Sequence, residues 1–216
     1  MTKIFYIILG IIMLAFSSMA NADENKIVIK MEKVTPNERA LVAEIFTRIR
    51  RNETISGEFF QTDNYTAKNK GALGFFYFET PKKINFTYSP PNKIQIISNG
   101  SQILVKDEKR RSKKYYPAGS TPLKFLTEDP QKLAYSDKVK DVYEKENKIF
   151  VRMSQDSVFG KSDMTVEFTK NSLELLGWTV HEKRNDVHIE LYNMKYNTQL
   201  DDNLFYVEPA HQNNSN

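Results

Sequence analysis

The chain has 216 residues, of which 40% are hydrophobic and 27% charged; its formal net charge is +4 at pH 7, and it has no cysteine. The absence of cysteine excludes a disulfide framework, a cysteine zinc site, an iron–sulfur cluster, a cysteine nucleophile and the lipidated N-terminal cysteine of a bacterial lipoprotein. With 8 glycines, 8 prolines and 12% aromatic residues, the composition is that of a globular domain rather than of a disordered or collagen-like chain.

The N-terminal segment has the three parts of a secretory signal. Lys3 supplies a positive charge, residues 4–16 are almost wholly apolar, and an Ala-Asn-Ala sequence ending at Ala22 fits a cleavage site. The apolar run is shorter than the roughly 20 residues needed to span a bilayer. We therefore expect residues 1–22 to be a cleaved signal peptide and residues 23–216 to be one domain in the periplasm, whose oxidising environment suits a protein without cysteine.

Residues 36–51 are predicted to form an amphipathic helix. Thr35 can cap it, a proline occupies the first helical position, and Glu38 completes a capping box. Apolar residues then recur at helical spacing, at Val42, Ile45, Phe46 and Ile49.

From residue 55 the apolar period changes to two, which is typical of strands. The predicted strands are residues 55–62, 71–80, 84–88, 93–98, 102–107, 148–154, 163–169, 173–182, 187–196 and 204–207. Between the strand that ends at residue 107 and the strand that starts at residue 148, a helical turn is predicted at residues 123–127, and Asp129 with Pro130 can start another helix. The tail from residue 211 is polar. About ten short strands at hairpin spacing predict a mainly β protein with a large antiparallel sheet, curled into a barrel or sandwich, and helices over an open side.

A run of charged residues at 106–114 is predicted to be the solvated tip of a hairpin. The alternative is a contact with anionic lipid headgroups or with an acidic partner. Nucleic acid is not expected as a partner of an exported protein.

Common catalytic signatures are missing from the sequence. It has no G-x-S-x-G, no P-loop and no G-x-G-x-x-G, and His181 lacks the second histidine of a zincin motif. His181 and His188 flank a predicted turn, but two histidines alone make a poor metal site, and Asp201 with Asp202 fits a solvated turn. We therefore predict no catalytic residues, no metal, no cofactor and no enzymatic activity.

Aromatic residues crowd both faces of two neighbouring strands. Phe76 and Phe78 share one face of the first strand, and Phe75 and Tyr77 share the other. The next strand has one apolar face, formed by Ile84, Phe86 and Tyr88. The pattern fits either a sandwich core with half-buried outer aromatics or an apolar concavity that holds an acyl chain.

Four stretches resemble the LolA family of periplasmic outer-membrane lipoprotein carriers, in an order that covers about residues 36–209. They are Ser-Gly-Glu-Phe-Phe-Gln at 56–61, the aromatic strands at 71–88, the hairpin at 94–107, and the segment 173–209 with Gly-Trp-Thr-Val at 177–180. The resemblance implies an incomplete, half-open antiparallel β-barrel of about ten to eleven strands, with a helical lid over an apolar cavity.

By position, the resemblance assigns six residues to the acyl-chain cavity: Phe59, Phe76, Phe78, Ile84, Phe86 and Tyr88. It assigns five to the lid: Ile45, Ile49, Leu123, Phe125 and Leu126. The family commonly has an arginine before the proline that ends the second strand. Thr80 stands there in this chain and is taken as the gating position.

The resemblance also implies partners. A carrier of this kind accepts acylated lipoproteins from an inner-membrane ABC-type release complex and delivers them to an outer-membrane acceptor or to the membrane itself; we expect a monomer. The alternative is a regulatory protein on the same half-barrel that senses lipid or lipoprotein.

Overall fold

The structure is a computed structural model. It describes residues 34–64, 71–118, 125–126, 128–157, 160–181 and 185–209. The predicted signal peptide at residues 1–22, the polar tail from residue 211 and the expected lid residue Leu123 lie outside these ranges. In the described part, no helix is both long and apolar enough to cross a membrane.

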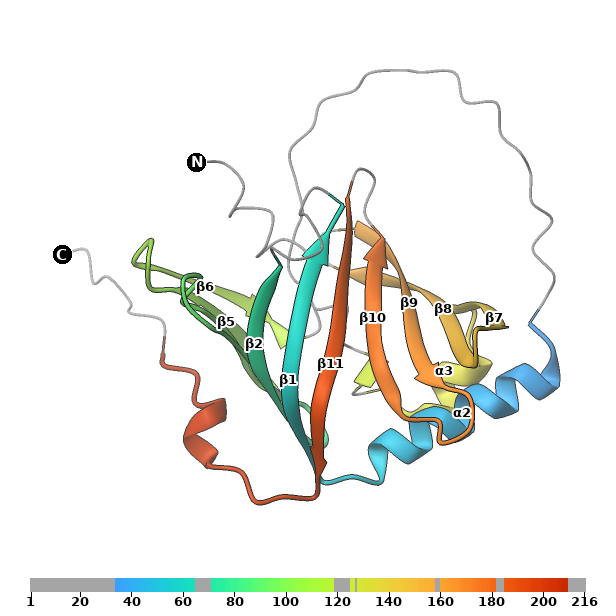
Figure 1. Cartoon of the computed structure of the whole chain (residues 1–216). Helices are drawn as coiled ribbons and strands as arrows, with labels where there is room; N and C mark the ends of the chain where they lie inside the picture. Colours follow the sequence, from blue (N-terminus) through green and yellow to red (C-terminus); the bar gives the residue numbers. More distant parts are fainter. Residues whose placement is uncertain are drawn as a thin grey trace.

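Eleven antiparallel strands form one open sheet (Figure 1). Their order is β6-β5-β4-β3-β2-β1-β11-β10-β9-β8-β7, so β6 and β7 are its two edges. The strands are β1 (Thr54–Asp63), β2 (Ala72–Glu79), β3 (Lys83–Tyr88), β4 (Ile94–Asn99), β5 (Gln102–Asp107), β6 (Ser112–Pro117), β7 (Val139–Lys145), β8 (Lys148–Ser157), β9 (Gly160–Thr169), β10 (Leu175–His181) and β11 (Asp186–Tyr196). The unclosed sheet with few helices confirms the predicted half-open antiparallel barrel.

The two edge strands were not predicted. Residues 112–114 belong to β6 rather than to the hairpin tip, which is confined to residues 108–111. Strand β6 has no fully buried residue, and β7 buries only Val139 and Val142. Edge strands face solvent along one side and commonly carry charged residues, so neither strand shows the apolar alternation of a central strand.

The predicted strand at residues 204–207 is wrong. Residues Asp202–Phe205 form a short 3-10 helix, η3, because the Asp201 carboxylate accepts a hydrogen bond from the Asn203 backbone N–H at 2.9 Å and starts a helical turn.

Helix α2 (Pro36–Arg50) confirms the predicted amphipathic helix. The Thr35 hydroxyl accepts from the Glu38 backbone N–H at 3.3 Å, and the Glu38 carboxylate accepts from the Thr35 N–H at 2.7 Å. These bonds satisfy two backbone donors that a helix start leaves unpaired. The helix buries one apolar stripe: Val42, Ala43, Ile45, Phe46 and Ile49.

Helix α3 (Pro130–Tyr135) starts where predicted, capped by Asp129, whose carboxylate accepts from the Lys132 N–H at 2.8 Å. It packs against α2, and Leu133 and Ala134 are fully buried. We call α2, residues 125–126 and α3 the lid. The buried apolar side chains of the lid belong to the same main core as those of the sheet.

A second, smaller apolar layer lies on the opposite face of the sheet. Ile97 and Leu104 are cross-strand partners on β4 and β5, and they are buried outside the main core. Residues 201–209, which we call the C-terminal strap, cross this face: the Asn85 amide donates to the Leu204 carbonyl at 2.5 Å, and Phe205 is 3% exposed. The outer side of β3 to β5 is therefore covered by the strap, and the lid covers the inner side of the sheet.

Candidate functional site

All six predicted cavity residues lie in the main core and are at most 5% exposed. Strand register brings them together, because Phe76 pairs with Phe86 and Phe78 with Ile84 across β2 and β3. The Phe59 ring lies over Gly74, where a Cβ atom would come within 2.5 Å of the ring. A glycine is needed at this position because any side chain would displace the ring.

We call these six residues the wall, and the aromatic rings among them contact one another. The Phe59 centroid lies 5.2 Å from that of Phe86 and 4.9 Å from that of Tyr88, both edge to face. Phe76 stacks on Phe86 at 5.9 Å. Such pairs contribute about 0.5–1.5 kcal/mol each beyond the area that they bury.

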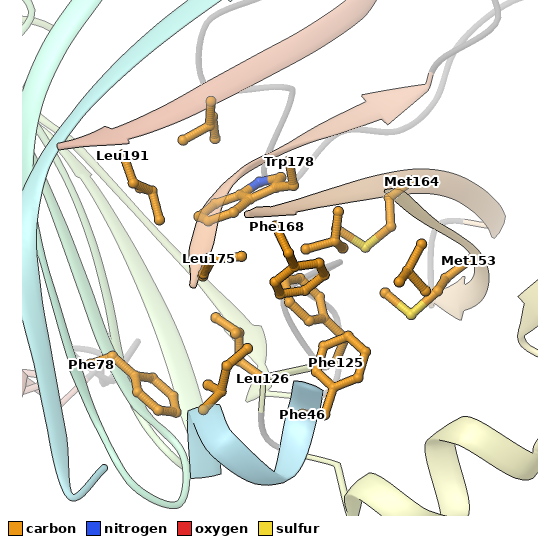
Figure 2. Close-up of a cluster of buried hydrophobic side chains, with 14 of the residues drawn as sticks. Phe46, Phe78, Phe125, Leu126, Met153, Met164, Phe168, Leu175, Trp178 and Leu191 are labelled. Atoms are coloured by element: carbon orange, nitrogen blue, oxygen red, sulfur yellow. The ribbon is translucent and has the colours of Figure 1, made fainter. Parts of the chain in front are cut away.

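The lid rings contact aromatic side chains of β9 and β10 beside this wall. Ile45, Ile49, Phe125 and Leu126 are all buried. Phe125 contacts Phe46 of α2 at 5.8 Å and Trp178 of β10 at 6.2 Å, and Trp178 lies 6.0 Å from Phe86. Figure 2 shows Phe46 and Phe125 beside Phe168 and below Trp178. A continuous line of aromatic contacts therefore runs from the lid to the predicted wall.

Sequence reasoning did not assign Phe46, Phe168 and Trp178 to the site. Phe46 lies on the same helical stripe as Ile45 and Ile49, and that spacing was the signal that could have found it. Trp178 pairs with Ile189 of β11 and Val166 of β9, so period-two counting from those two strands also places it on the inner face.

Two polar groups lie within this apolar core. The Tyr88 hydroxyl donates to the Gln61 side-chain oxygen at 2.6 Å, and burial raises the pKa of Tyr88 above its ordinary value. The indole N–H of Trp178 has no hydrogen-bond partner among the described residues. An unpaired buried donor costs free energy, so Trp178 contributes to this core through its ring contacts.

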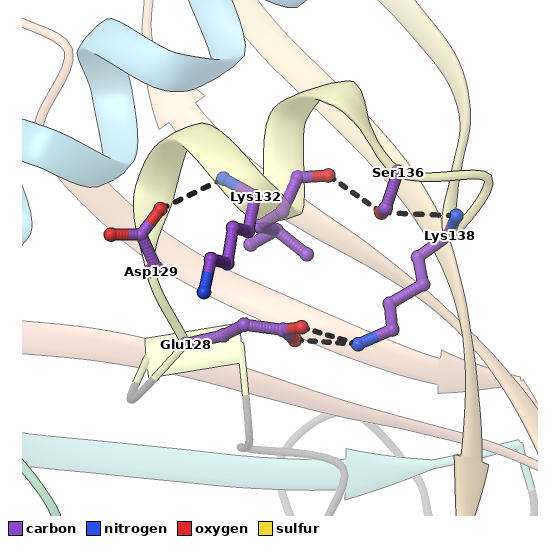
Figure 3. Close-up of polar contacts among 6 residues, drawn as sticks. Glu128, Asp129, Lys132, Ser136 and Lys138 are labelled. Carbon is purple, nitrogen blue, oxygen red and sulfur yellow. Dashed lines mark hydrogen bonds and ion pairs between the residues drawn. The ribbon is translucent and has the colours of Figure 1, made fainter.

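Polar contacts hold the lid helices together at their solvent side. The Arg39 guanidinium donates from Nη1 to the carbonyls of Ala134 at 2.6 Å and Ser136 at 2.9 Å, at the C-terminal end of α3. Lys138 pairs with both carboxylate oxygens of Glu128, at 2.5 and 2.7 Å, across the base of α3 (Figure 3). The lid is therefore fastened at its rim by polar contacts, and its buried apolar side chains belong to the main core.

Thr80, the predicted gating position, lies at the end of β2 next to the C-terminus of α2. Its backbone N–H donates to the Glu53 carbonyl and its hydroxyl to the Asn52 carbonyl, each at 2.8 Å. Arg50 of α2 donates to the neighbouring Pro81 carbonyl at 3.4 Å. Thr80 thus ties β2 to the segment that leaves α2.

Two surface pockets adjoin the lid. One, of about 480 Å³, lies between α2 and α3, and another, of about 200 Å³, lies between the end of α2 and the β9–β10 turn. Neither is lined by any of the six wall residues. The wall rings contact each other and Trp178, and Trp178 in turn contacts Phe125 of the lid.

The histidines are not among the wall residues, and each has its own partners. His181 contacts the Thr165 hydroxyl at 2.8 Å and Asp186 at 3.3 Å, whereas His188 contacts the Thr179 hydroxyl at 2.9 Å. In the ranges that the structure describes, no cluster of three or more histidine, aspartate or glutamate side chains could hold a metal ion.

Residues 50–208 match the sequence model of the family described as outer membrane lipoprotein carrier protein LolA. Comparison with the sequences of curated proteins gave no match.

Solved structures with a similar fold come from several bacteria. A DUF1329 family protein from Desulfovibrio piger is 13% identical, with a TM-score of 0.43 over 79% of this chain and 96% of that chain. The Mycobacterium tuberculosis lipoprotein LppX is 10% identical, with a TM-score of 0.39 over 77% and 99%. A LolA superfamily protein from Nitrosomonas europaea is 9% identical, with a TM-score of 0.41 over 78% and 97%.

Proposed function

The chain belongs to the LolA family of outer membrane lipoprotein carrier proteins, and from this premise we propose that it is a periplasmic carrier without enzymatic activity. It binds the acyl chains of lipoproteins between the concave sheet and the lid, and delivers them to the outer membrane. The observation that carries the proposal is the line of ring contacts from Phe46 through Phe125 and Trp178 to Phe86. It joins the lid to the apolar wall through ring contacts.

The closed core makes binding reversible. A sixteen-carbon acyl chain is worth about 12 kcal/mol at about 0.8 kcal/mol per buried methylene. Full burial of three chains would exceed the roughly 18–21 kcal/mol at which non-covalent affinities saturate. Opening the lid breaks ring contacts, and this cost offsets part of the gain. An acceptor can therefore still remove the cargo.

The remaining features of the proposal follow from the family and from the sequence. Acylated lipoproteins would be loaded by an inner-membrane ABC-type release complex and passed as a one-to-one complex, by a monomer, to an outer-membrane acceptor or to the membrane. The predicted signal peptide supports a periplasmic location. Thr80 is proposed as the gating position because it joins β2 to the end of α2.

A release assay tests the carrier function. Spheroplasts that hold a labelled, acylated lipoprotein in the inner membrane would be incubated with the mature protein, residues 23–216. We expect the lipoprotein to appear in the supernatant as a soluble one-to-one complex, whereas a non-acylated form of the same lipoprotein should not bind. Uptake that is independent of acylation would refute the proposal.

The wall assignment is tested by Phe86→Glu. This change places a carboxylate among the Phe59, Phe76 and Trp178 rings, and we expect it to abolish uptake of the acylated lipoprotein. The matched control is Phe75→Glu, which makes the same change on the outer face of β2, where the side chain is 46% exposed. Circular dichroism would check the fold of both variants. Normal uptake by a folded Phe86→Glu protein contradicts the assignment.

A further inference from the structure

The corner formed by the β3–β4 and β5–β6 turns is strongly basic. Residues 106–114 hold six lysines and arginines against two carboxylates, a net charge of +4, which equals the net charge of the whole chain. Lys93 adds another cation from the neighbouring turn, where its carbonyl accepts from the Glu108 backbone N–H at 3.1 Å. The charge of this protein is therefore concentrated at one corner of the sheet.

The tip of the β5–β6 hairpin is held in one conformation. The Asp107 carboxylate, only 3% exposed, accepts from the Arg110 backbone N–H at 3.0 Å and pairs with the Arg110 guanidinium at 3.4 Å. Arg111 closes the turn with a positive φ of 52°. The carboxylate of Asp107 is thus used inside the turn, and it stabilises the turn that presents the outer cations.

Three exposed cations at this corner have no ion-pair or hydrogen-bond partner for their side chains among the described residues: Lys93, Lys109 and Arg111. An unpaired cation keeps its full attraction for an external anion, whereas a paired one loses most of it. These three side chains come from two adjacent turns, so they face one external surface together.

We propose that this basic corner binds the anionic headgroups of a phospholipid bilayer and docks the protein on a membrane. A protein partner is less favoured because the exposed tip, residues 108–111, has no apolar or aromatic side chain, and protein interfaces depend on such anchors. A charged surface that lacks them fits the diffuse negative potential of a bilayer, which attracts each lysine or arginine without specific geometry.

Docking through this corner adds a membrane contact to the proposed function. It rests on that function, because a lipoprotein carrier must come to a membrane to load and unload its cargo. In Figure 1 the β5–β6 hairpin lies on the opposite side of the molecule from α2 and α3. Docking would therefore leave the lid free to open.

The experiment is sedimentation of the cargo-free protein with vesicles of phosphatidylcholine containing 0 or 30% phosphatidylglycerol. We expect binding only to the anionic vesicles, and loss of that binding when sodium chloride is raised from about 0.05 M to 0.5 M, since salt shortens the screening length. The variant Lys109→Gln/Arg111→Gln should bind about 25-fold more weakly, since each cation near an anionic surface contributes a factor of about five.

A second double variant, Lys82→Gln/Lys195→Gln, serves as the matched control. It removes the same charge from exposed positions at the opposite end of the strands, and its vesicle binding should stay within about twofold of the native value. An equal loss of vesicle binding in both variants would overturn the docking site, because the binding would then depend only on the net charge of the protein. Vesicle binding that does not depend on phosphatidylglycerol would overturn the docking site too, and would favour an acidic protein as the partner of the basic corner. Acyl uptake in solution, measured on the same variants, is expected to be unchanged. Failure of the native protein to take up acylated lipoprotein would count against the carrier function, whereas loss of vesicle binding with normal uptake concerns the docking site alone.

Discussion

Tyr88 places a phenol inside the concave core, where burial raises its pKa. In the unfolded chain the same group ionises near pH 10. Above pH 10 the unfolded state therefore loses a proton that the folded state keeps, and the free energy of unfolding falls by about 1.4 kcal/mol per pH unit. Below pH 10 both states are neutral and the group contributes no pH dependence.

The variant Tyr88→Phe tests this linkage. It should be about 1 kcal/mol less stable at pH 8, because the hydrogen bond to Gln61 is lost. Between pH 8 and pH 11 it should lose about 1.4 kcal/mol less stability than the native protein. Urea unfolding at the two pH values measures both effects. The control Tyr206→Phe removes a phenol from a 63% exposed site and should be about as stable as the native protein at pH 8. If the stability of Tyr88→Phe changed with pH as that of the native protein does, the account of Tyr88 would be contradicted.

Single residues also show how far the sequence predicts the site. The period of two along β2 and β3 correctly placed Phe76, Phe78 and Phe86 on one buried face. The same period could not say which face of the sheet the lid covers, because both faces of β2 carry aromatics. Trp178 was not assigned because its neighbours across the sheet come from β9 and β11, and only tertiary pairing brings Trp178 near Phe125.

Among the elements, the lid is proposed to compete with acyl chains for the concave core through its own side chains. Phe125→Ala removes the contacts with Phe46 and Trp178, and we expect the free energy of unfolding to fall by about 3 kcal/mol. Because the closed lid competes with cargo, a less stable lid raises the fraction of binding-competent protein and should tighten apparent acyl affinity at least about tenfold. Titration with a fluorescent fatty acid measures the change.

The outcome separates two roles of Phe125. If the ring contributed mainly to the loaded state, the same substitution would weaken binding, and that result would contradict a competing lid. Phe205→Ala is the matched control, because it removes a buried phenylalanine of the same size from the opposite side of the sheet.

Elements were predictable where local chemistry decides them. The capping box of Thr35 and Glu38 marks the start of α2 in the sequence as clearly as in the structure. Strand β6 was not predicted because the adjacent Lys113 and Lys114 are typical of a solvated loop. Backbone pairing with β5 makes this segment a strand. The segment 204–207 has strand-like composition, yet the Asp201 cap turns it into η3.

At the scale of the whole molecule, the C-terminal strap stabilises the fold from the face of the sheet opposite the wall and the lid. Phe205 lies under the Lys83 ammonium, 5.5 Å from the ring centroid, and the Glu208 carboxylate pairs with Lys113 at 2.6 Å. We expect Phe205→Ala to lower the free energy of unfolding by about 3 kcal/mol, since it removes the main apolar contact of the strap.

Acyl affinity of the Phe205→Ala protein should equal that of the native protein, because the sheet separates the strap from the concave core. Thermal unfolding and fatty-acid titration of the same sample give both values. A large change in affinity would mean that the strap acts through the sheet on the inner face.

The strand order has a consequence for how the chain folds. Among the described strands, neighbours in the sheet are also neighbours in the chain, with the single exception of β1 and β11 at the centre. Strands β1 to β6 and β7 to β11 are therefore two meanders that can each form through short-range hairpins. The pairing of β1 with β11 joins residues more than a hundred positions apart, and closing so long a loop is slow. We expect two early-forming halves whose alignment is settled last, at a seam where a bulge between Ser56 and Glu58 sets the register.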